Sequence, residues 1–232
     1  MKRCLTLLLD LTIILIFGCA TVNSDSRDDR ILAVSRMQGD NEKLIQALQE
    51  TSYDDVRIEV VKLLGDYMAL AAIAFDNSYS IFVREQAARR LKDEEDVIRV
   101  VQDTTFSIEL RNELTSNIFS EKNNKVIVDC LDINLDSRIR AMKNINDAFY
   151  LRGKVYDKTA EKVLRMCAIA QISDINLLKE IANSRLAYEF RKCAIEKMCK
   201  NVNALKELIR MGVRGKLLSV IVPFYDRLTL SF

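Results

Sequence analysis

Cysteines are the residues of this chain best able to form covalent bonds, and the sequence contains six. Cys167 and Cys193 stand two positions after Arg165 and Arg191, so equivalent helices would bring the two thiols near one another. A disulfide between them is one interpretation, and a pair of structural thiols in a helical core is the other. The chain has no histidine and no C-x-x-C pair, which argues against a zinc site.

The acidic run Glu94-Glu95-Asp96 could supply paired carboxylates for acid–base catalysis. It directly follows Asp93, however, and aspartate commonly begins a helix whose first turn favours further acids. The sequence also contains no glycine-rich phosphate loop and no G-x-S-x-G motif. We therefore expect this run to be an ordinary helix start, and we expect neither enzymatic activity nor a cofactor or metal.

A different chemistry is indicated at the N-terminus, where Cys19 follows a basic start, an apolar run and the residues Ile16-Phe17-Gly18. This pattern resembles a bacterial lipoprotein signal peptide. The resemblance implies that residues 1–18 are removed, that Cys19 becomes the acylated first residue, and that residues 19–27 form a short tether. An uncleaved N-terminal anchor and an ordinary signal peptide are the alternatives.

Arginine recurs at a regular interval along the rest of the chain. The column consists of Arg30, Arg57, Arg84, Arg111, Arg138, Arg165 and Arg191. Its period of about 27 residues indicates a repeated structural unit. Within "IFVREQAARRL", Arg84 falls inside the apolar stripe of an amphipathic helix, so a buried partner must satisfy its charge.

The residues around each arginine predict a helix, a tight turn and a second helix. Apolar residues stand seven positions after each arginine, and acids precede most of them by two. Residues suited to cap a second helix stand nine positions after, at Asp66, Asp93, Ser120, Asp147 and Asp174. Residues 147–157 make a poor second helix by this pattern. A terminal helix is expected from Val213 to about Val222, ending before Pro223.

These units resemble the short-repeat branch of the HEAT-repeat superfamily. The match is carried by "DDVRIEVVKLL", "IFVREQAARRL", "IELRNELTSNI" and "YEFRKCAIEKM". The resemblance implies an all-α, right-handed α-solenoid of about seven 27-residue helix pairs plus a terminal capping helix. It would cover residues 28–222, with residues 223–232 as a C-terminal cap or tail.

The repeat gives the arginine column a physical role at the seam between successive units. The aliphatic stems would lie along the core, and the heads would donate to helix C-terminal carbonyls or to acids of a neighbouring unit. We expect Arg84, Arg111 and Arg138 to be substantially buried. Arg30 and Arg214 lie at the ends of the repeat array, where we expect solvent to replace such partners.

The balance of charges argues against a nucleic-acid partner. The 35 basic and 33 acidic side chains are interspersed, so the sequence shows no basic cluster of the kind that binds DNA or RNA. We expect a lipid-anchored module of the bacterial cell envelope, periplasmic or surface-facing, that binds a protein or acts as a scaffold. The alternatives are an envelope enzyme, lyase-like or active on the cell wall, and a spacer subunit of an assembly. A binder should show an exposed aromatic or mixed-charge stripe on its second helices.

Overall fold

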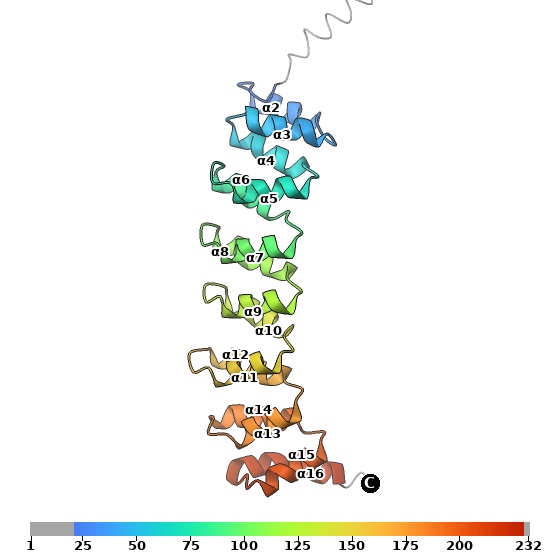
Figure 1. The fold of residues 1–232 in the computed structure, drawn as a ribbon, viewed down its shortest axis with the longest axis vertical. Helices are drawn as coiled ribbons and strands as arrows, with labels where there is room; N and C mark the ends of the chain where they lie inside the picture. The colour runs from blue at the N-terminus through green and yellow to red at the C-terminus, as the bar shows by residue number, and fades with distance from the viewer. Residues whose placement is uncertain (1–20, 230–232) are drawn as a thin grey trace, which may run out of the picture. The chain divides into compact units, whose positions relative to one another are not determined.

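The computed structural model describes residues 21–229, with side chains through Arg227. Over this range the chain is helical and contains no β-strand, which confirms the predicted all-α class. The chain divides into two compact units, and Figure 1 labels the helices of each. Unit 1 ends at Leu110 and unit 2 begins at Arg111, within a single short helix, and each unit is described by itself.

Unit 1 is built from short helices in which first and second helices alternate. Their bounds are α2 (Arg27–Ser35), α3 (Asn41–Glu50), α4 (Asp54–Leu63), α5 (Tyr67–Phe75), α6 (Ile81–Ala88) and α7 (Glu94–Gln102), with α8 (Ile108–Leu114) at the division. The first helices α2, α4 and α6 pack in sequence, while α3 packs on α4 and α5 packs on α6. Each of these second helices is therefore held by the first helix that follows it.

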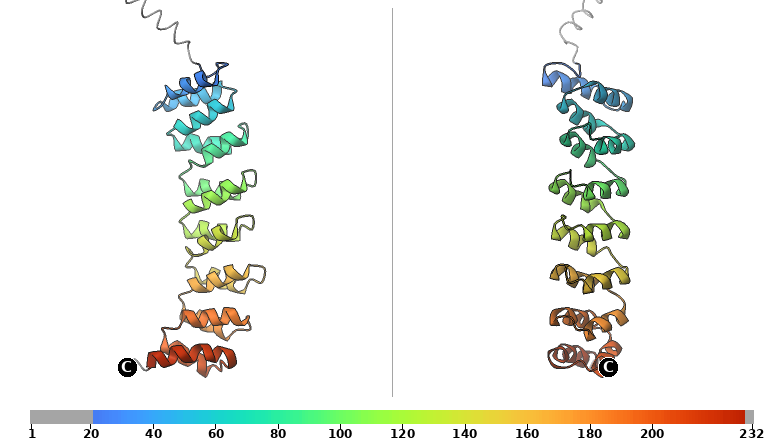
Figure 2. Two further views of the ribbon diagram at one scale, coloured as in Figure 1. Left: turned by 180° about the vertical axis from the view of Figure 1, so that it is seen from behind. Right: turned by 60° about the vertical axis from the view of Figure 1, so that its left-hand side comes forward.

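Unit 2 repeats this arrangement. A 3-10 turn (Thr115–Asn117) leads into α9 (Glu121–Asp129), α10 (Leu135–Met142), α11 (Ala148–Tyr156), α12 (Lys162–Gln171), α13 (Ile175–Asn183), α14 (Tyr188–Lys197), α15 (Val202–Arg210), a second 3-10 turn (Gly215–Leu217) and α16 (Leu218–Thr229). The first helices α10, α12 and α14 pack in a row, and α9, α11 and α13 each pack on the next first helix (Figure 2).

Side-chain caps explain why the second helices begin where they do. All five residues predicted as caps precede a second helix, and each accepts a hydrogen bond from a backbone N–H of the first turn. These bonds satisfy donors that have no partner inside the helix. The same role falls to Asp40 for α3 and to Asn201 for α15.

Two sequence predictions about helices are wrong. Residues 148–156 form a regular helix, because Asp147 caps its first turn and Leu151 and Val155 are buried one turn apart. The terminal helix does not end before Pro223, which lies inside α16. A proline removes a single backbone donor, and here the buried Ile221 holds the helix while Pro223 faces solvent.

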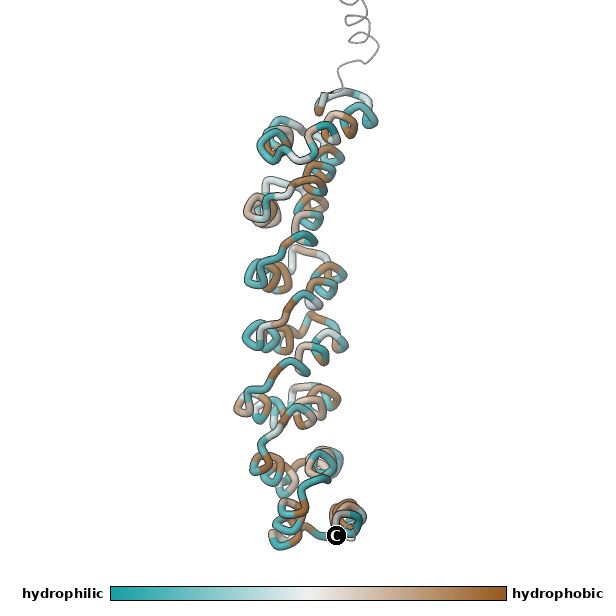
Figure 3. Tube along the Cα trace, turned by 90° about the vertical axis from the view of Figure 1, so that its right-hand side faces the viewer, coloured by the Kyte–Doolittle hydropathy of each residue, from teal (hydrophilic) through white to brown (hydrophobic). Residues whose placement is uncertain are grey.

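Apolar side chains fill the space between the helices of each unit. The core of unit 1 includes Val56, Val60 and Leu70, and that of unit 2 includes Ile127 and Leu178, none more than 1% exposed. Most helices carry hydrophobic residues on one side and hydrophilic residues on the other (Figure 3). Burial of this one-sided apolar surface is the main force that holds a helix pair to its neighbours.

Candidate functional site

Four arginines of the predicted column close the C-terminal end of the preceding second helix. In each, Nε donates to the carbonyl of the second-last residue of that helix. The pairs are Arg84 with Ala74 at 3.0 Å, and Arg138 with Val128, Arg165 with Val155 and Arg191 with Ala182, all at 2.9 Å. Carbonyls at a helix C-terminus lack a partner within the helix and carry the negative end of its dipole. A guanidinium therefore stabilises them both by donating a hydrogen bond and by its positive charge.

The column is buried to different depths. Arg84, Arg111 and Arg138 are 7%, 4% and 4% exposed, as predicted, whereas Arg165 and Arg191 are only half-buried. A buried guanidinium needs most of its donors satisfied by the chain, because an unpaired buried charge costs several kcal/mol; the Nε atoms of Arg30 and Arg57 are buried without an acceptor in the part of the chain that the structure describes.

Arg30 differs from the sequence expectation. It is 8% exposed, so the prediction that solvent would reach this first arginine is wrong. Its partners come from residues ahead of α2, because Nη1 donates to the backbone carbonyls of Ser24 and Asp25 at 2.8 and 3.0 Å. Nη2 donates to Asp55 at 2.7 Å. Arg214, at the other end of the column, is exposed as expected.

Aromatic rings lie under several of these guanidiniums, and the sequence reasoning missed them. The ring centroids lie 4.0 Å (Arg30 and Tyr53), 5.5 Å (Arg57 and Tyr79), 4.8 Å (Arg84 and Phe106) and 4.2 Å (Arg165 and Phe190) from the guanidinium carbon. The first three rings follow their arginines at a nearly constant spacing in the sequence, which could have revealed them. Stacking on a ring face is a favourable contact for a guanidinium that has left water.

Acids complete the contacts of the arginines at the start of unit 2. Arg111 Nη2 lies 3.6 Å from Asp132 Oδ2, and Arg138 Nη1 lies 2.5 Å from Glu161 Oε1. The backbone N–H at Glu161 and the Arg138 guanidinium together hold the pKa of that carboxyl below its usual range. Because the donors of the column point at the chain itself, these arginines stabilise the helix pairs and do not form a ligand site.

The candidate thiols and acids do not assemble into a reactive centre. Cys130, Cys167, Cys193 and Cys199 are free and half-buried, so the disulfide considered from the sequence is not formed. Burial raises the pKa of Cys167 and of Cys193, which is the opposite of the shift that activates a thiol nucleophile. The run Glu94-Glu95-Asp96 forms the first turn of α7 behind its cap Asp93. No cluster of potential metal ligands occurs among the residues that the structure describes.

A mixed-charge stripe follows the second helices of unit 2. Between α9 and α11, Lys125 pairs with Asp147 at 2.7 Å and Lys154 pairs with Asp129 at 2.6 Å. The hydroxyl of Tyr150 donates to Asp129 Oδ1 at 2.9 Å. Burial, together with this hydrogen bond, raises the pKa of Tyr150. This side of the unit therefore carries a continuous set of polar contacts from one second helix to the next.

The stripe continues onto α13 and α15. Arg152 of α11 donates through Nη2 to Glu180 Oε1 at 2.7 Å, and the hydroxyl of Tyr156 donates to the same oxygen at 3.2 Å. Arg152 lowers the pKa of Glu180, and burial raises the pKa of Tyr156. Lys179 of α13 pairs with Glu207 of α15. Each of these charged groups is neutralised by a group on a neighbouring second helix.

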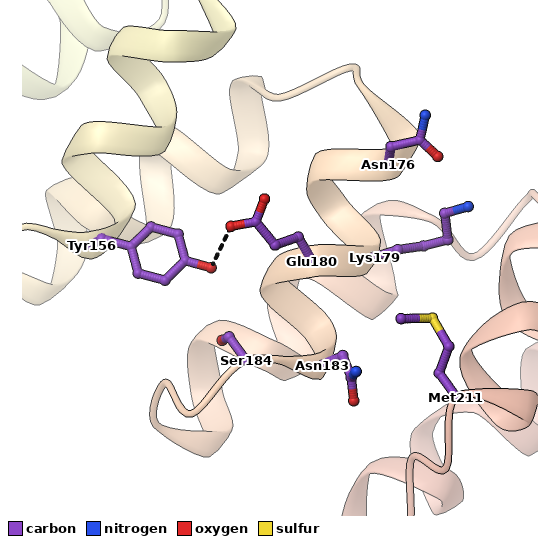
Figure 4. A pocket seen from close by; sticks show the side chains of 7 residues that line it. All are labelled: Tyr156, Asn176, Lys179, Glu180, Asn183, Ser184 and Met211. Atoms are coloured by element: carbon purple, nitrogen blue, oxygen red, sulfur yellow. Dashed lines mark hydrogen bonds between the residues drawn. The ribbon is translucent and has the colours of Figure 1, made fainter.

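A hollow of about 510 Å³ opens on this face of unit 2. Tyr156, at the end of α11, lies on one side and Met211, which follows α15, lies on the other, with α13 as the floor (Figure 4). We call it the α13 hollow; its lining comprises Tyr156, Asn176, Lys179, Glu180, Asn183, Ser184 and Met211. The lining combines an aromatic ring and a thioether with amides and mutually paired charges.

The two amides of the α13 hollow are its available hydrogen-bonding groups. Asn176 and Asn183 are exposed, and neither side chain makes a hydrogen bond to any part of the chain that the structure describes. They lie two helical turns apart on one face of α13, about 10 Å along the helix. Ser184, by contrast, donates its hydroxyl to the carbonyl of Ile181 at 2.7 Å. A bound molecule would therefore meet two free amides between an aromatic ring and a methionine.

Comparison with known proteins found no match to the chain among family models, curated proteins or solved structures. Cys19 and the predicted signal peptide 1–18 lie outside the described residues. Among residues 21–229, no helix is long and apolar enough to cross a membrane.

Proposed function

We propose that this chain is a lipid-anchored protein of the bacterial cell envelope that binds a protein partner. Its lipid would be carried by Cys19, and its helix pairs would continue through both units as a right-handed, HEAT-like solenoid of about seven repeats. The support for the anchor is the N-terminal sequence, in which an apolar run ends in a small residue and cysteine. The support for the repeat is the arginine column and its recurring contact with the preceding second helix.

The observation that carries the binding proposal is the α13 hollow. An asparagine amide offers donors and an acceptor, which match the C=O and N–H of a peptide group. Three residues of an extended chain span about 10 Å, which is also the separation of Asn176 and Asn183 along α13. Tyr156 and Met211 offer an aromatic face and a polarisable thioether for apolar side chains. The occupant proposed is therefore an extended segment of a partner protein.

The paired charges favour an uncharged segment over an acidic or basic one. Lys179 and Glu180 both line the hollow, yet each is neutralised by Glu207 or by Arg152. A charged ligand would have to compete with these ion pairs, whereas a neutral peptide would leave them in place. The lining hydroxyl of Ser184 is directed at its own helix, which supports binding over nucleophilic catalysis.

A photo-crosslinking amino acid at Asn183 tests the binding site in intact cells. We expect a protein adduct from this position, and we expect Asn176→Asp to reduce the yield of that adduct by introducing an unpaired charge. The matched control places the same crosslinker at Glu196, which is exposed on the first helix α14 of the same unit. Equal adducts from both positions, or none from Asn183 in correctly localised protein, would contradict the proposed site and favour a spacer.

The anchor is tested separately by Cys19→Ala. The variant should accumulate as an uncleaved, unacylated precursor, because the thiol is the acyl acceptor. Mass spectrometry of the wild-type protein should show an acylated residue 19 at the mature N-terminus. A mature N-terminus elsewhere, or the absence of acyl mass, would refute the anchor without bearing on the α13 hollow.

A further inference from the structure

The residues directly ahead of α2 are fixed to unit 1, where the sequence predicts only a short tether. Val22 is buried, with 8% of its surface exposed. The hydroxyl of Thr51, which is 2% exposed, donates to the carbonyl of Val22 at 3.3 Å. Thr51 follows α3, so it belongs to the folded body of unit 1. One apolar contact and one buried hydrogen bond therefore attach residue 22 to the first helix pair.

A second attachment comes from Arg30. Its Nη1 donates to two backbone carbonyls of the same segment, at Ser24 and Asp25, while Nη2 binds Asp55 of α4. The guanidinium also stacks on Tyr53 at 4.0 Å. If residues 21–26 came away, Nη1 of a buried arginine would lose both acceptors, which is costly. The arginine thus binds the segment ahead of α2 to the start of the next helix pair.

We propose that residues 21–26 act as a clamp that holds unit 1 directly against a lipid bilayer surface. The proposal rests on acylation of Cys19, the anchor of the proposed function. From residue 19 to residue 22 the chain can span at most about 11 Å, whereas a loose tether over residues 19–27 could span about 30 Å. The clamp therefore leaves two residues, Ala20 and Thr21, between the acylated cysteine and a side chain that is buried in unit 1.

A close bilayer contact follows from this short reach. Glycerol and acyl chains on Cys19 would lie in the membrane, so Val22 would lie within about 11 Å of the interface. Val22 would then stay close to the membrane at every tilt that unit 1 adopts. The partner of this end of the molecule is thus a lipid surface. The short chain between Cys19 and Val22, together with the clamp, determines how far unit 1 can lie from that surface.

Protease release from membranes tests the clamp on the full-length, acylated protein. Proteinase K should cut a loose tether and liberate the soluble helical domain, whereas a clamped segment should resist. We compare wild type with a variant that carries a ten-residue Gly/Ser insertion between Ala20 and Thr21. The insertion keeps the clamp and adds slack on its membrane side, so it should be released at least tenfold faster than wild type.

Two substitutions separate the clamp from simple shielding by the membrane. Val22→Asp and Thr51→Val leave the tether length unchanged but remove the apolar and the hydrogen-bonded attachment. We expect Val22→Asp to be released about tenfold faster than wild type and Thr51→Val to be intermediate, with helical circular dichroism unchanged. Release of wild type as fast as the insertion variant overturns the clamp. Equal, slow release of wild type and Val22→Asp also overturns it.

Failure of the anchor is distinguishable from failure of the clamp. If wild type lacks acyl mass and does not float with vesicles, the anchor of the proposed function fails, and the bilayer contact fails with it. Hydrogen exchange then decides the clamp alone. The amide of Ser24, which donates to Thr21 O at 3.1 Å, should exchange more slowly than in Val22→Asp if the segment is fixed. Equal exchange would show that residues 21–26 are not held.

Discussion

The two units use the same arginine column with a different balance of partners. In unit 1 the guanidiniums of Arg30, Arg57 and Arg84 lie over aromatic rings and each also lies within 4 Å of an acid. At the start of unit 2, Arg111 and Arg138 approach acids that precede the next first helix, and a ring returns under Arg165. What stays constant between Arg84 and Arg138 is the inner contact, where Nε donates to the end of the preceding second helix.

This difference distinguishes the inner contact, which is shared between the units, from the outer contact, which varies between repeats. The inner contact satisfies a helix terminus at Arg84, Arg138, Arg165 and Arg191, whereas the buried Nε of Arg57 has no acceptor among the described residues. The outer contact depends on which residue enters the next repeat: Phe106 follows Arg84, while Ile133 takes the equivalent position after Arg111. A ring and a carboxylate both stabilise a guanidinium, but salt screens the carboxylate far more strongly.

The largest effect is expected from Arg138→Ala in unit 2. The change leaves the Val128 carbonyl and Glu161 without their partner and removes buried stem packing, so we expect the free energy of unfolding to fall by about 3 kcal/mol. Urea unfolding followed by circular dichroism measures the loss. Arg140→Ala is the matched control, since Arg140 is exposed on the same helix and should change stability by less than about 0.5 kcal/mol. Equal losses would mean that the inner contact contributes nothing.

The sequence predicted the repeated parts well and the ends poorly. The arginine period and the cap column at Asp66 and Asp147 follow from local rules that act the same way in every repeat. The environment of Arg30 did not follow, because its acceptors are backbone carbonyls at Ser24 and Asp25, which no side-chain pattern records. The continuation of α16 through Pro223 also depends on tertiary packing, which overrides local preference.

For the candidate site, the sequence predicted only that second helices could carry an exposed aromatic or mixed-charge stripe. Alternating charges on Lys125, Lys154 and Glu180 made a mixed-charge stripe foreseeable on the second helices of unit 2. The hollow itself was not, because its walls at Tyr156 and Met211 come from segments that lie far apart in the sequence. The sequence cannot show which of many asparagines remain without a partner, since that depends on the distances between packed helices.

A smaller effect is expected where unit 1 relies on a ring. Phe106→Leu should lower the free energy of unfolding by about 1.5 kcal/mol, because it removes the stacked face under Arg84 and leaves a small void. The loss should be the same at low and at high salt concentration. A loss that falls by half at high salt would show that the substitution acts through the ion pair of Arg84 with Asp103, 3.7 Å away, and not through the ring.

The counterpart in unit 2 is Glu161→Gln. We expect a loss of about 0.5 to 1 kcal/mol, because the carboxylate lies partly in solvent and water replaces much of its contact with Arg138. Unlike the loss in Phe106→Leu, this one should shrink as salt is raised. Denaturant unfolding at both salt concentrations measures the two variants side by side, and identical salt responses would remove the distinction between the units.

Acid should weaken the contacts of the column that contain a carboxylate. The hydrogen bond from Arg30 lowers the pKa of Asp55 in the folded state. A lowered folded pKa adds stability above the unfolded value of about 3.9, and that stability is lost as pH falls through the folded pKa. The free energy of unfolding should therefore drop between about pH 5 and pH 2, and it should drop less steeply in Asp55→Asn. Parallel curves for the two proteins would contradict this linkage.

The smallest effect is expected at the end of the column. Arg214 is exposed and follows the previous arginine after a shortened interval. Arg214→Ala should change the free energy of unfolding by less than about 0.5 kcal/mol, because water solvates its head as well as any partner would. Denaturant unfolding beside Arg138→Ala measures the difference. A comparable loss in both variants would show that burial does not set the contribution of the column.

The arginine Nε–H groups themselves give the most direct test of the repeat. A ¹H–¹⁵N spectrum selective for these groups, recorded at neutral pH, reports hydrogen exchange at each Nε. The account predicts slowly exchanging signals for Arg84, Arg138, Arg165 and Arg191, each removed by its own Arg→Lys variant, and rapid exchange for Arg214. Rapid exchange at all five positions would contradict the claim that these four arginines close the ends of the preceding second helices.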